Sequence, residues 1–124
     1  MSFQDFTTLD VWLASRKLTN SIYNITKEFP TSEQFGLINQ MRRCAVSIPS
    51  NIAEGIGRNS AKGTLVFLYV SRGSLFELET QLYIALDQQF INEEIFNKIS
   101  DEIQTSKKLL NGFINYFKKL ENGK

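Results

Sequence analysis

The sequence contains no histidine, and this absence removes several kinds of chemistry. Without an imidazole, the usual general base for a serine or cysteine nucleophile is missing. The Glu-x-x-His ligands of a di-iron helical bundle are missing for the same reason. Glu77 and Glu79 point in different directions on a helix, so they do not form a carboxylate pair. The sequence therefore argues against an enzyme and predicts no cofactor, metal site or catalytic residue. A metal-dependent nuclease that uses carboxylates is the one enzymatic alternative.

Cysteine and long apolar runs are also scarce. The single cysteine, Cys44, excludes an intramolecular disulfide and a cysteine-based zinc site. Its place on the flank of an apolar stripe favours a small buried hydrophobe over a reactive thiol. The chain has no run of about 18 apolar residues that could span a membrane. Its start lacks the basic and apolar regions of a signal peptide. We therefore expect a cytoplasmic protein with no membrane partner.

Proline is rare, which leaves room for long helices. Between Pro30, Pro49 and the glycine-containing turns, apolar residues recur at the spacing of a helical face. The expected helices cover residues 5–28, 35–55, 60–88 and 92–120. The length of 124 residues suits one domain over positions 1–124. Four long amphipathic helices with short loops predict an all-α, up-down-up-down four-helix bundle.

Two residues inside these helices carry local predictions. Pro49 removes a backbone donor and clashes with the carbonyl group of Ala45, yet the apolar rhythm continues in phase beyond it. We therefore expect a kink at Pro49 in the second helix and not a break. Gly73 lies in the middle of the third helix, where glycine costs up to about 1 kcal/mol relative to alanine. This cost indicates close helix packing at Gly73.

Polar residues mark where the helices begin. After Pro30, Thr31 is in the position of a helix cap, with Gln34 three residues later to complete a capping box. Phe35 is then placed to act as a hydrophobic staple. The third and fourth helices are expected to be capped by Asn59 or Ser60, and by Asn92.

The charges nearly cancel, but they are segregated along the chain. There are 14 basic and 13 acidic residues, for a net charge of +1. No acid lies between Glu33 and Glu54, between Glu54 and Glu77, or between Glu102 and Glu121. Such windows are typical either of ordinary solvated faces or of a surface that contacts anions. The candidate nucleic-acid contacts, at a turn and along the fourth helix, are Arg58, Lys62, Lys107, Lys108, Lys118 and Lys119.

The turn near these residues is not a nucleotide-binding loop. Segment 55–60 contains glycines ahead of a helix, but no strand precedes it and it lacks the Lys-Ser/Thr pair of a P-loop. We interpret it as a plain helix–helix turn, from which Arg58 and Lys62 could still reach a phosphate.

The second helix has an unusual polar face opposite its apolar stripe. This face consists of Arg43, Ser47, Ser50 and Glu54, and its two serines would permit close approach of another backbone or of another chain. A further prediction concerns charges on the flanks of the apolar stripes. If the second and third helices are antiparallel about Asn59, residues facing each other have numbers that sum to roughly 119. We therefore predict a partly buried ion pair between Arg42 and Glu79 that fixes helix register.

Two long motifs carry a family resemblance. They are FGLINQMRRCAVSIPSNIAEG at 35–55 and RGSLFELETQL at 72–82, and Val11-Trp12 and Ile22-Tyr23 precede them. The combination closely resembles the four-helix-bundle proteins encoded by intervening sequences within bacterial 23S ribosomal RNA genes. The resemblance implies a ring-like homopentamer. It also implies a relationship to accessory proteins of diversity-generating retroelements, which have a basic surface and bind nucleic acid.

The resemblance also suggests roles for residues of the shared motifs. It implies that these residues serve assembly and not catalysis: Asn51, Glu54, Gly55, Arg72, Gly73, Glu77 and Glu79. Two functions stay open. The first is a homo-oligomeric accessory protein that binds RNA or a ribonucleoprotein through basic surfaces. The second is a structural or protein-interaction scaffold without a nucleic-acid partner. Binding to structured RNA that weakens steeply with added salt would favour the first.

Overall fold

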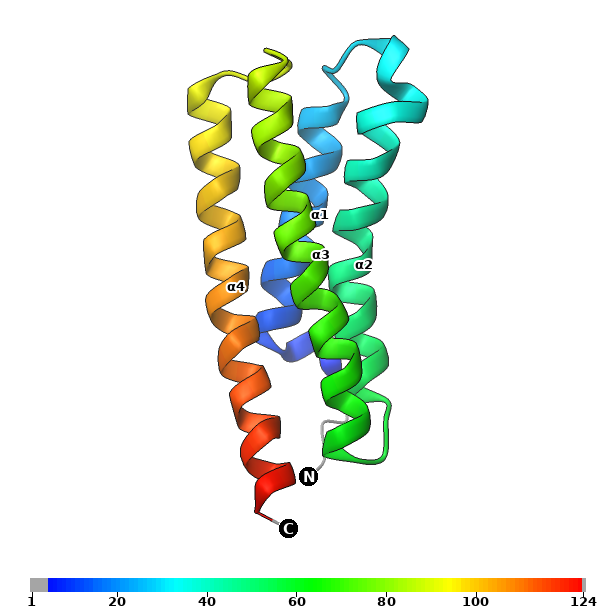
Figure 1. Cartoon of the computed structure of the whole chain (residues 1–124), viewed down its shortest axis with the longest axis vertical. Helices are drawn as coiled ribbons and strands as arrows, with labels where there is room; N and C mark the ends of the chain where they lie inside the picture. The colour runs from blue at the N-terminus through cyan, green and yellow to red at the C-terminus, as the bar shows by residue number, and fades with distance from the viewer. Residues whose placement is uncertain (1–4, 124) are drawn as a thin grey trace.

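The computed structural model describes residues 5–123 and has the all-α, up-down-up-down four-helix architecture that the sequence predicts (Figure 1). The helices are α1 (Asp10–Thr26), α2 (Asn39–Ile56), α3 (Ala61–Asp87) and α4 (Glu93–Asn122). Each helix packs against two neighbours, because α1 and α3 both contact α2 and α4. Short helical turns at Phe6–Thr8, Thr31–Glu33 and Gln34–Ile38 precede α1 and α2.

The core is mainly aliphatic and runs the length of the bundle. Its largest fully buried side chains are Phe117, Leu18, Ile22, Met41, Ile48, Ile52, Leu68, Leu75, Leu78, Leu82, Ile99 and Ile103. Helices α1, α2 and α4 each bury one apolar stripe, as their spacing predicts. Helix α3 is different because it carries large apolar side chains on its outward side as well. The outer α3 face consists of Val66, Tyr69, Val70, Phe76, Tyr83 and Ile84, all of them exposed.

Side-chain hydroxyl groups join α2 and α3 at close range. The Thr64 hydroxyl donates to the Gly55 carbonyl at 2.8 Å, and the Ser71 hydroxyl donates to the Ile48 carbonyl at 2.9 Å. Both pairs of numbers sum to 119, which confirms the predicted register. A Cβ atom added to Gly55 would meet the Thr64 carbonyl oxygen at 3.1 Å. The two backbones therefore approach closely at Gly55.

Gly73 does not mark close packing, so that prediction is wrong. A Cβ atom added there would meet nothing within 4 Å. Gly73 is exposed and lies on the outward side of α3, among the residues of the outer α3 face. Its helical position alone did not reveal whether it faced a neighbouring helix or solvent.

Helix α2 continues through Pro49 as one α-helix, so the predicted kink is not confirmed. Proline cannot donate to the carbonyl group of Ala45, four residues earlier. That carbonyl instead accepts a hydrogen bond from the Thr19 hydroxyl of α1 at 3.0 Å. The same hydroxyl lies 2.9 Å from the Ser15 carbonyl, so its proton is shared between two acceptors. A neighbouring helix thus supplies the donor that proline removes.

The start of α2 differs from the predicted capping box. The Glu33 carboxylate, and not the Thr31 side chain, accepts a hydrogen bond from a backbone N–H here, that of Leu37, at 3.0 Å. A 3₁₀ turn and then a wider π-helical turn follow Pro30, so α2 starts at Asn39. Phe35 is 92% exposed, so it is not a staple. The other predicted caps are found, since Ser60 accepts from the Gly63 N–H at 3.1 Å and Asn92 from the Ile95 N–H at 2.8 Å.

Candidate interaction surfaces

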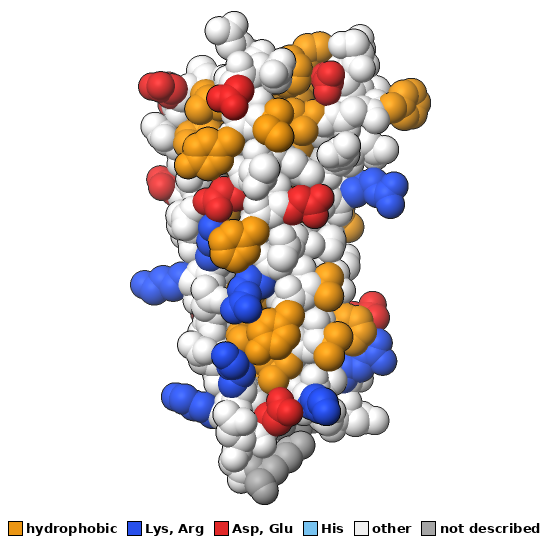
Figure 2. Space-filling model, in the orientation of Figure 1, with side chains coloured by type: hydrophobic (Ala, Val, Ile, Leu, Met, Phe, Trp, Pro, Cys, Tyr) orange, Lys and Arg blue, Asp and Glu red, His pale blue; other side chains and the backbone are white. Residues whose placement is uncertain are grey.

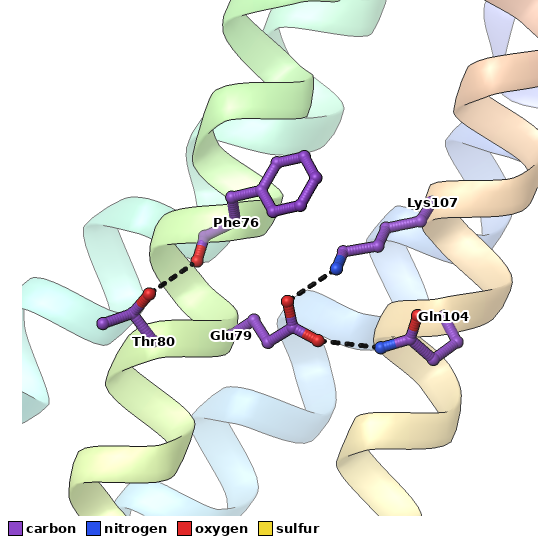
Figure 3. A network of polar contacts seen from close by, with 5 residues as sticks. All are labelled: Phe76, Glu79, Thr80, Gln104 and Lys107. Atoms are coloured by element: carbon purple, nitrogen blue, oxygen red, sulfur yellow. Dashed lines mark hydrogen bonds and ion pairs between the residues drawn. The ribbon is translucent and has the colours of Figure 1, made fainter.

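A charged network joins α3 to α4 around Glu79 (Figure 3). The Lys107 ammonium donates to one Glu79 carboxylate oxygen at 2.6 Å, and the Gln104 amide donates to the other at 2.8 Å. The Lys107 nitrogen also lies 4.3 Å from the centre of the Phe76 ring. The hydrogen bond from Lys107 lowers the pKa of the Glu79 carboxyl, with Gln104 adding to the effect. Lys107 is therefore engaged inside the protomer, unlike the other lysines of α4.

The predicted ion pair between Arg42 and Glu79 is wrong. Arg42 Nε donates to the Thr26 hydroxyl at 2.8 Å, and its Nη2 donates to the Tyr23 carbonyl at 3.4 Å. Both acceptors belong to α1, whereas the partners of Glu79 belong to α4. The register predicted the correct heights along the helices. The two side chains leave their helices on opposite flanks, however, so they do not meet.

The small polar face of α2 is divided between an inner and an outer part. The Ser47 hydroxyl lies 3.0 Å from the Ser74 hydroxyl of α3, and the Asn51 amide donates to the Ser47 carbonyl at 2.8 Å. The first contact places Ser47 at the junction with α3, and the second joins Asn51 to Ser47 within α2. Arg43 and Ser50 are exposed. Ser47 thus serves close packing within the bundle, whereas the outer part, Arg43 and Ser50, is accessible to other molecules.

Cys44 lies beside this junction. Its thiol donates to the Ser74 carbonyl at 3.0 Å. Burial, together with the nearby Glu77 carboxylate, raises the pKa of the Cys44 thiol to about 12. A thiol with this pKa is almost wholly protonated at neutral pH, so Cys44 is a packing residue and not a nucleophile.

Of the other predicted nucleic-acid contacts, Arg58, Lys62, Lys118 and Lys119 lie toward the end of the bundle where α2 and α4 finish and α3 begins, and Lys108 lies in the middle of α4. Lys62, Lys108, Lys118 and Lys119 are exposed. Arg58 is also exposed but donates to the Glu54 carboxylate at 3.1 Å and lies over the Phe67 ring at 4.4 Å. The ion pair with Arg58 gives Glu54, which belongs to the small polar face of α2, a partner within the protomer.

Arg72, another residue of the shared motifs, lies near the middle of α3. Its guanidinium is 5.0 Å from the centre of the Tyr69 ring, and it donates to the Asn111 side chain of α4 at 3.4 Å. On the face drawn in Figure 2, most lysine and arginine side chains lie in the lower half and most carboxylates in the upper half. Orange apolar side chains run between them, down the middle of that face.

A groove between α1 and α2 escaped the sequence reasoning. Its volume is about 640 Å³, and its lining includes Tyr23, Arg42, Arg43, Ser50 and Asn51. The motif Ile22-Tyr23 was visible in the sequence, but nothing there indicated that Tyr23 would face α2. Arg43 also lines a smaller groove of about 350 Å³ with Glu77 on its other side, toward α3.

Metal-binding clusters and membrane-spanning helices are both absent from the described part of the chain. Residues 5–123 contain no group of three or more histidine, cysteine, aspartate or glutamate side chains that could hold a metal ion. Within the same residues, no helix is both long and apolar enough to cross a membrane.

Comparison with known proteins places the chain in a family. A family model described as 23S rRNA-intervening sequence protein matches residues 7–112. The chain belongs to this family. A solved structure from Bacteroides thetaiotaomicron, described as a protein with unknown function from the S23 ribosomal protein family, superposes with a TM-score of 0.78. It is 24% identical and the match covers 84% of this chain and 97% of that one, which supports the fold alone. No curated protein matches the chain.

Proposed function

We propose that this member of the 23S rRNA-intervening sequence family is a non-enzymatic accessory protein that assembles with copies of itself and binds RNA. The observation that carries the RNA part is the segregation of charge on a chain whose net charge is only +1. The proposed RNA surface, named the basic end, reaches from the end where α2 and α4 finish to the middle of α3 and α4, and it consists of Arg58, Lys62, Arg72, Lys108, Lys118 and Lys119. Lys107 is left out because Glu79 holds it.

Electrostatics explains why this arrangement suits RNA. Exposed lysines without carboxylate partners attract phosphates, and each contact releases condensed counterions. A neutral chain with dispersed charges would gain little from this effect, whereas a basic end concentrates it. Of the residues in the basic end, only Arg58 is in an ion pair within the described residues, and Lys62, Arg72, Lys108, Lys118 and Lys119 are in none. They are therefore the residues whose loss should weaken RNA binding most.

The RNA part is tested with a triple variant and a matched control. In a filter-binding assay with structured RNA, the parent should lose affinity steeply as salt is added. Lys108→Gln, Lys118→Gln and Lys119→Gln together should lower the salt slope by about 0.7–0.9 for each phosphate that the variant no longer neutralises. Lys17→Gln, Lys27→Gln and Lys98→Gln remove the same charge from exposed positions elsewhere and should leave the slope near that of the parent. Equal reductions of the slope in both triple variants would contradict the proposed surface.

Self-assembly is supported by the outer α3 face. A helix that is apolar all round is normally covered by protein. Tyr83 and Phe76 are each 53% exposed, and Val66 is 57% exposed. A set of large apolar side chains along one helix is typical of a protein–protein contact. We propose that a second copy of the chain covers this face, within the pentamer that the family resemblance implies.

Light scattering tests this assembly. The parent should have a mass several times the 14.2 kDa of one chain, and about five times for a pentamer. Val70→Glu combined with Ile84→Glu should dissociate it, because an interface does not tolerate buried unpaired carboxylates. Leu13→Glu is the control, since Leu13 on α1 is 42% exposed and Ile84 is 43% exposed. A monomeric parent, or dissociation only in the control, would overturn the α3 assignment.

The alternative function is a protein-interaction scaffold without RNA. It is favoured by the same apolar α3 face together with the low net charge. The two functions separate in the filter-binding assay. A parent that assembles but retains no RNA at low salt would support the scaffold.

A further inference from the structure

The groove between α1 and α2 contains an arginine that the fold holds in one position. Arg42 Nε donates to the Thr26 hydroxyl at 2.8 Å, and that hydroxyl lies 2.7 Å from the Ile22 carbonyl, to which it donates. Thr26 is buried, with 1% of its surface exposed. Arg42 Nη2 donates to the Tyr23 carbonyl at 3.4 Å, and the guanidinium lies 4.7 Å from the centre of the Tyr23 ring. Two hydrogen bonds and one ring contact therefore fix the orientation of this cation.

No carboxylate neutralises the charge in the groove. All the acceptors of Arg42 are neutral oxygen atoms, and neither Arg42 nor Arg43 is in an ion pair within the described residues. A guanidinium has five N–H donors, of which two are used here, so the others remain free for a ligand. The groove lining contains both arginines and no acid. An anion bound there would meet two cations that are in no ion pair, and Arg42 is already held in position.

The remaining lining groups favour a nucleotide over a bare anion. Asn39, Ser50 and Asn51 bring uncharged donors and acceptors to the same groove. The amide nitrogen of Asn51 is already used on Ser47, which leaves its carbonyl oxygen as an acceptor. Tyr23 is 38% exposed and offers an aromatic ring edge and face next to the arginines. Bases of single-stranded RNA are recognised by aromatic or arginine stacking together with hydrogen bonds to their edges.

We propose that this groove binds one nucleoside monophosphate unit. The phosphate contacts Arg42 and Arg43, and the base lies against Tyr23 within reach of Asn39, Ser50 and Asn51. The volume of about 640 Å³ lies within the range of roughly 300–1,000 Å³ that is usual for small-molecule pockets. The unit can be part of an RNA strand or a free nucleotide. The inference rests on the proposed function in its RNA form, but it concerns a surface separate from the basic end.

The test is a titration of the whole chain with uridine 5′-monophosphate, uridine, inorganic phosphate and a uridine oligonucleotide. Binding is measured by calorimetry or by NMR chemical shifts. The monophosphate should bind at least tenfold more tightly than either uridine or phosphate alone. Arg42→Gln should weaken it by about 10- to 100-fold, the effect of removing a charge-assisted hydrogen bond. Arg16→Gln is the matched control, because Arg16 also lies over an aromatic ring, that of Trp12 at 5.5 Å, but outside this groove. It should change the affinity less than twofold.

Further variants separate a binding role from a structural one. Arg42 joins two helices, so Arg42→Gln could lower affinity by disturbing the fold. Arg43→Gln removes an exposed charge that is in no ion pair within the described bundle. It should weaken binding of the monophosphate without changing the thermal midpoint of the protein. Arg42→Lys keeps the charge but lacks the planar fork, and it should also weaken binding.

The titrations and the filter-binding assay together distinguish the source of the nucleotide unit and test the groove separately from the proposed function. Competition by the oligonucleotide supports an RNA strand as the source of the unit, and its absence supports a free nucleotide. Phosphate binding as tightly as the monophosphate, or no effect of Arg42→Gln and Arg43→Gln, would overturn the inference. If those variants also keep full RNA retention in the filter assay, the proposed function stands without the groove. If the parent retains no RNA yet binds the monophosphate, the proposed function fails and the groove remains.

Discussion

Glu79 illustrates how a charge on the flank of a helix stripe acquires its role. Its carboxylate accepts from Lys107 and Gln104, both on α4 and three residues apart, so it fixes the height of α3 relative to α4. The Glu79 side chain is 23% exposed, so water still screens the pair. Such a pair contributes at most about 1 kcal/mol to the free energy of unfolding. It contributes more to alignment than to stability.

The first prediction concerns the pH dependence of this pair. The pKa of Glu79 is lowered from 4.5 in the folded state, so the carboxylate stabilises the fold above pH 4.5. This stabilisation disappears as the pH falls from 4.5 through the lower folded value. Urea unfolding at pH 7 and pH 3 should show a smaller decrease of stability in acid for Glu79→Gln than for the parent. Asp101→Asn, which removes an exposed carboxylate of α4 outside any ion pair, should not reduce that decrease as much.

At the scale of elements, the path of α2 depends on its neighbours. Pro49 leaves the Ala45 carbonyl without its helical donor, and Thr19 of α1 supplies one. Gly55 allows the backbone of α2 to approach α3, where Thr64 and Ser71 donate to its carbonyl groups. Helix α2 is therefore held by hydroxyl groups from both sides as well as by its apolar stripe.

The second prediction tests the Thr19 hydrogen bond. Thr19→Val should cost about 1–3 kcal/mol of unfolding free energy, because a part-buried carbonyl is left without a partner. The cost should shrink when Pro49→Ala is also present, since alanine restores the backbone donor to Ala45. The control is Thr80→Val, whose exposed hydroxyl donates only to the Phe76 carbonyl within its own helix. Additive effects of the Thr19 and Pro49 changes would argue against the shared carbonyl.

The third prediction contrasts two helical glycines. Gly55→Ala should destabilise the fold by about 1–3 kcal/mol, because the new methyl group meets the Thr64 carbonyl oxygen at 3.1 Å. Gly73→Ala meets no atom within 4 Å and should stabilise an isolated protomer by about 0.5–1 kcal/mol through helix propensity. Chemical denaturation of both variants, in the dissociated Val70→Glu and Ile84→Glu background, measures the difference. A Gly55→Ala variant as stable as the parent, or more stable, would contradict the assignment of Gly55 to the close approach of the two backbones.

At the scale of the whole molecule, the surface divides by charge and by polarity. On the face drawn in Figure 2, most basic side chains lie toward one end and most carboxylates toward the other, and apolar side chains lie along α3 between them. The stability of a single protomer does not require this division. Charges spread evenly over the surface and polar residues on the outward side of α3 would stabilise a protomer equally well. Contacts with other molecules give each part a role, as the proposed assembly and RNA binding do.

The fourth prediction follows from that assembly. If copies of the chain cover the outer α3 face, folding is linked to association, and the thermal midpoint should rise with protein concentration. The linked stabilisation is up to about 1.4 kcal/mol for each tenfold increase in concentration. Differential scanning calorimetry over two decades of concentration measures it. The Val70→Glu and Ile84→Glu variant should have a midpoint independent of concentration, and an independent midpoint in the parent would speak against assembly.

The sequence by itself determined the number, order and direction of the helices. Apolar spacing, two prolines and a few caps suffice for this, because helix formation and burial of a stripe depend on residues close in the chain. The α2–α3 register also followed, since a short turn near Asn59 leaves only one antiparallel alignment. The family motifs, too, could be read from the chain alone.

The tertiary structure alone decided which side chains meet across helices. The rotation of each helix about its axis sends Arg42 to α1 and Glu79 to α4, although both lie at the same height. The same rotation leaves Gly73 exposed and brings Tyr23 to the groove of α2. Thr19 finds the carbonyl freed by Pro49 only because two helices pack side by side. Apolar spacing determines which face of a helix is buried. The partners of the residues on the flanks of that face depend on where the other helices of the bundle pack.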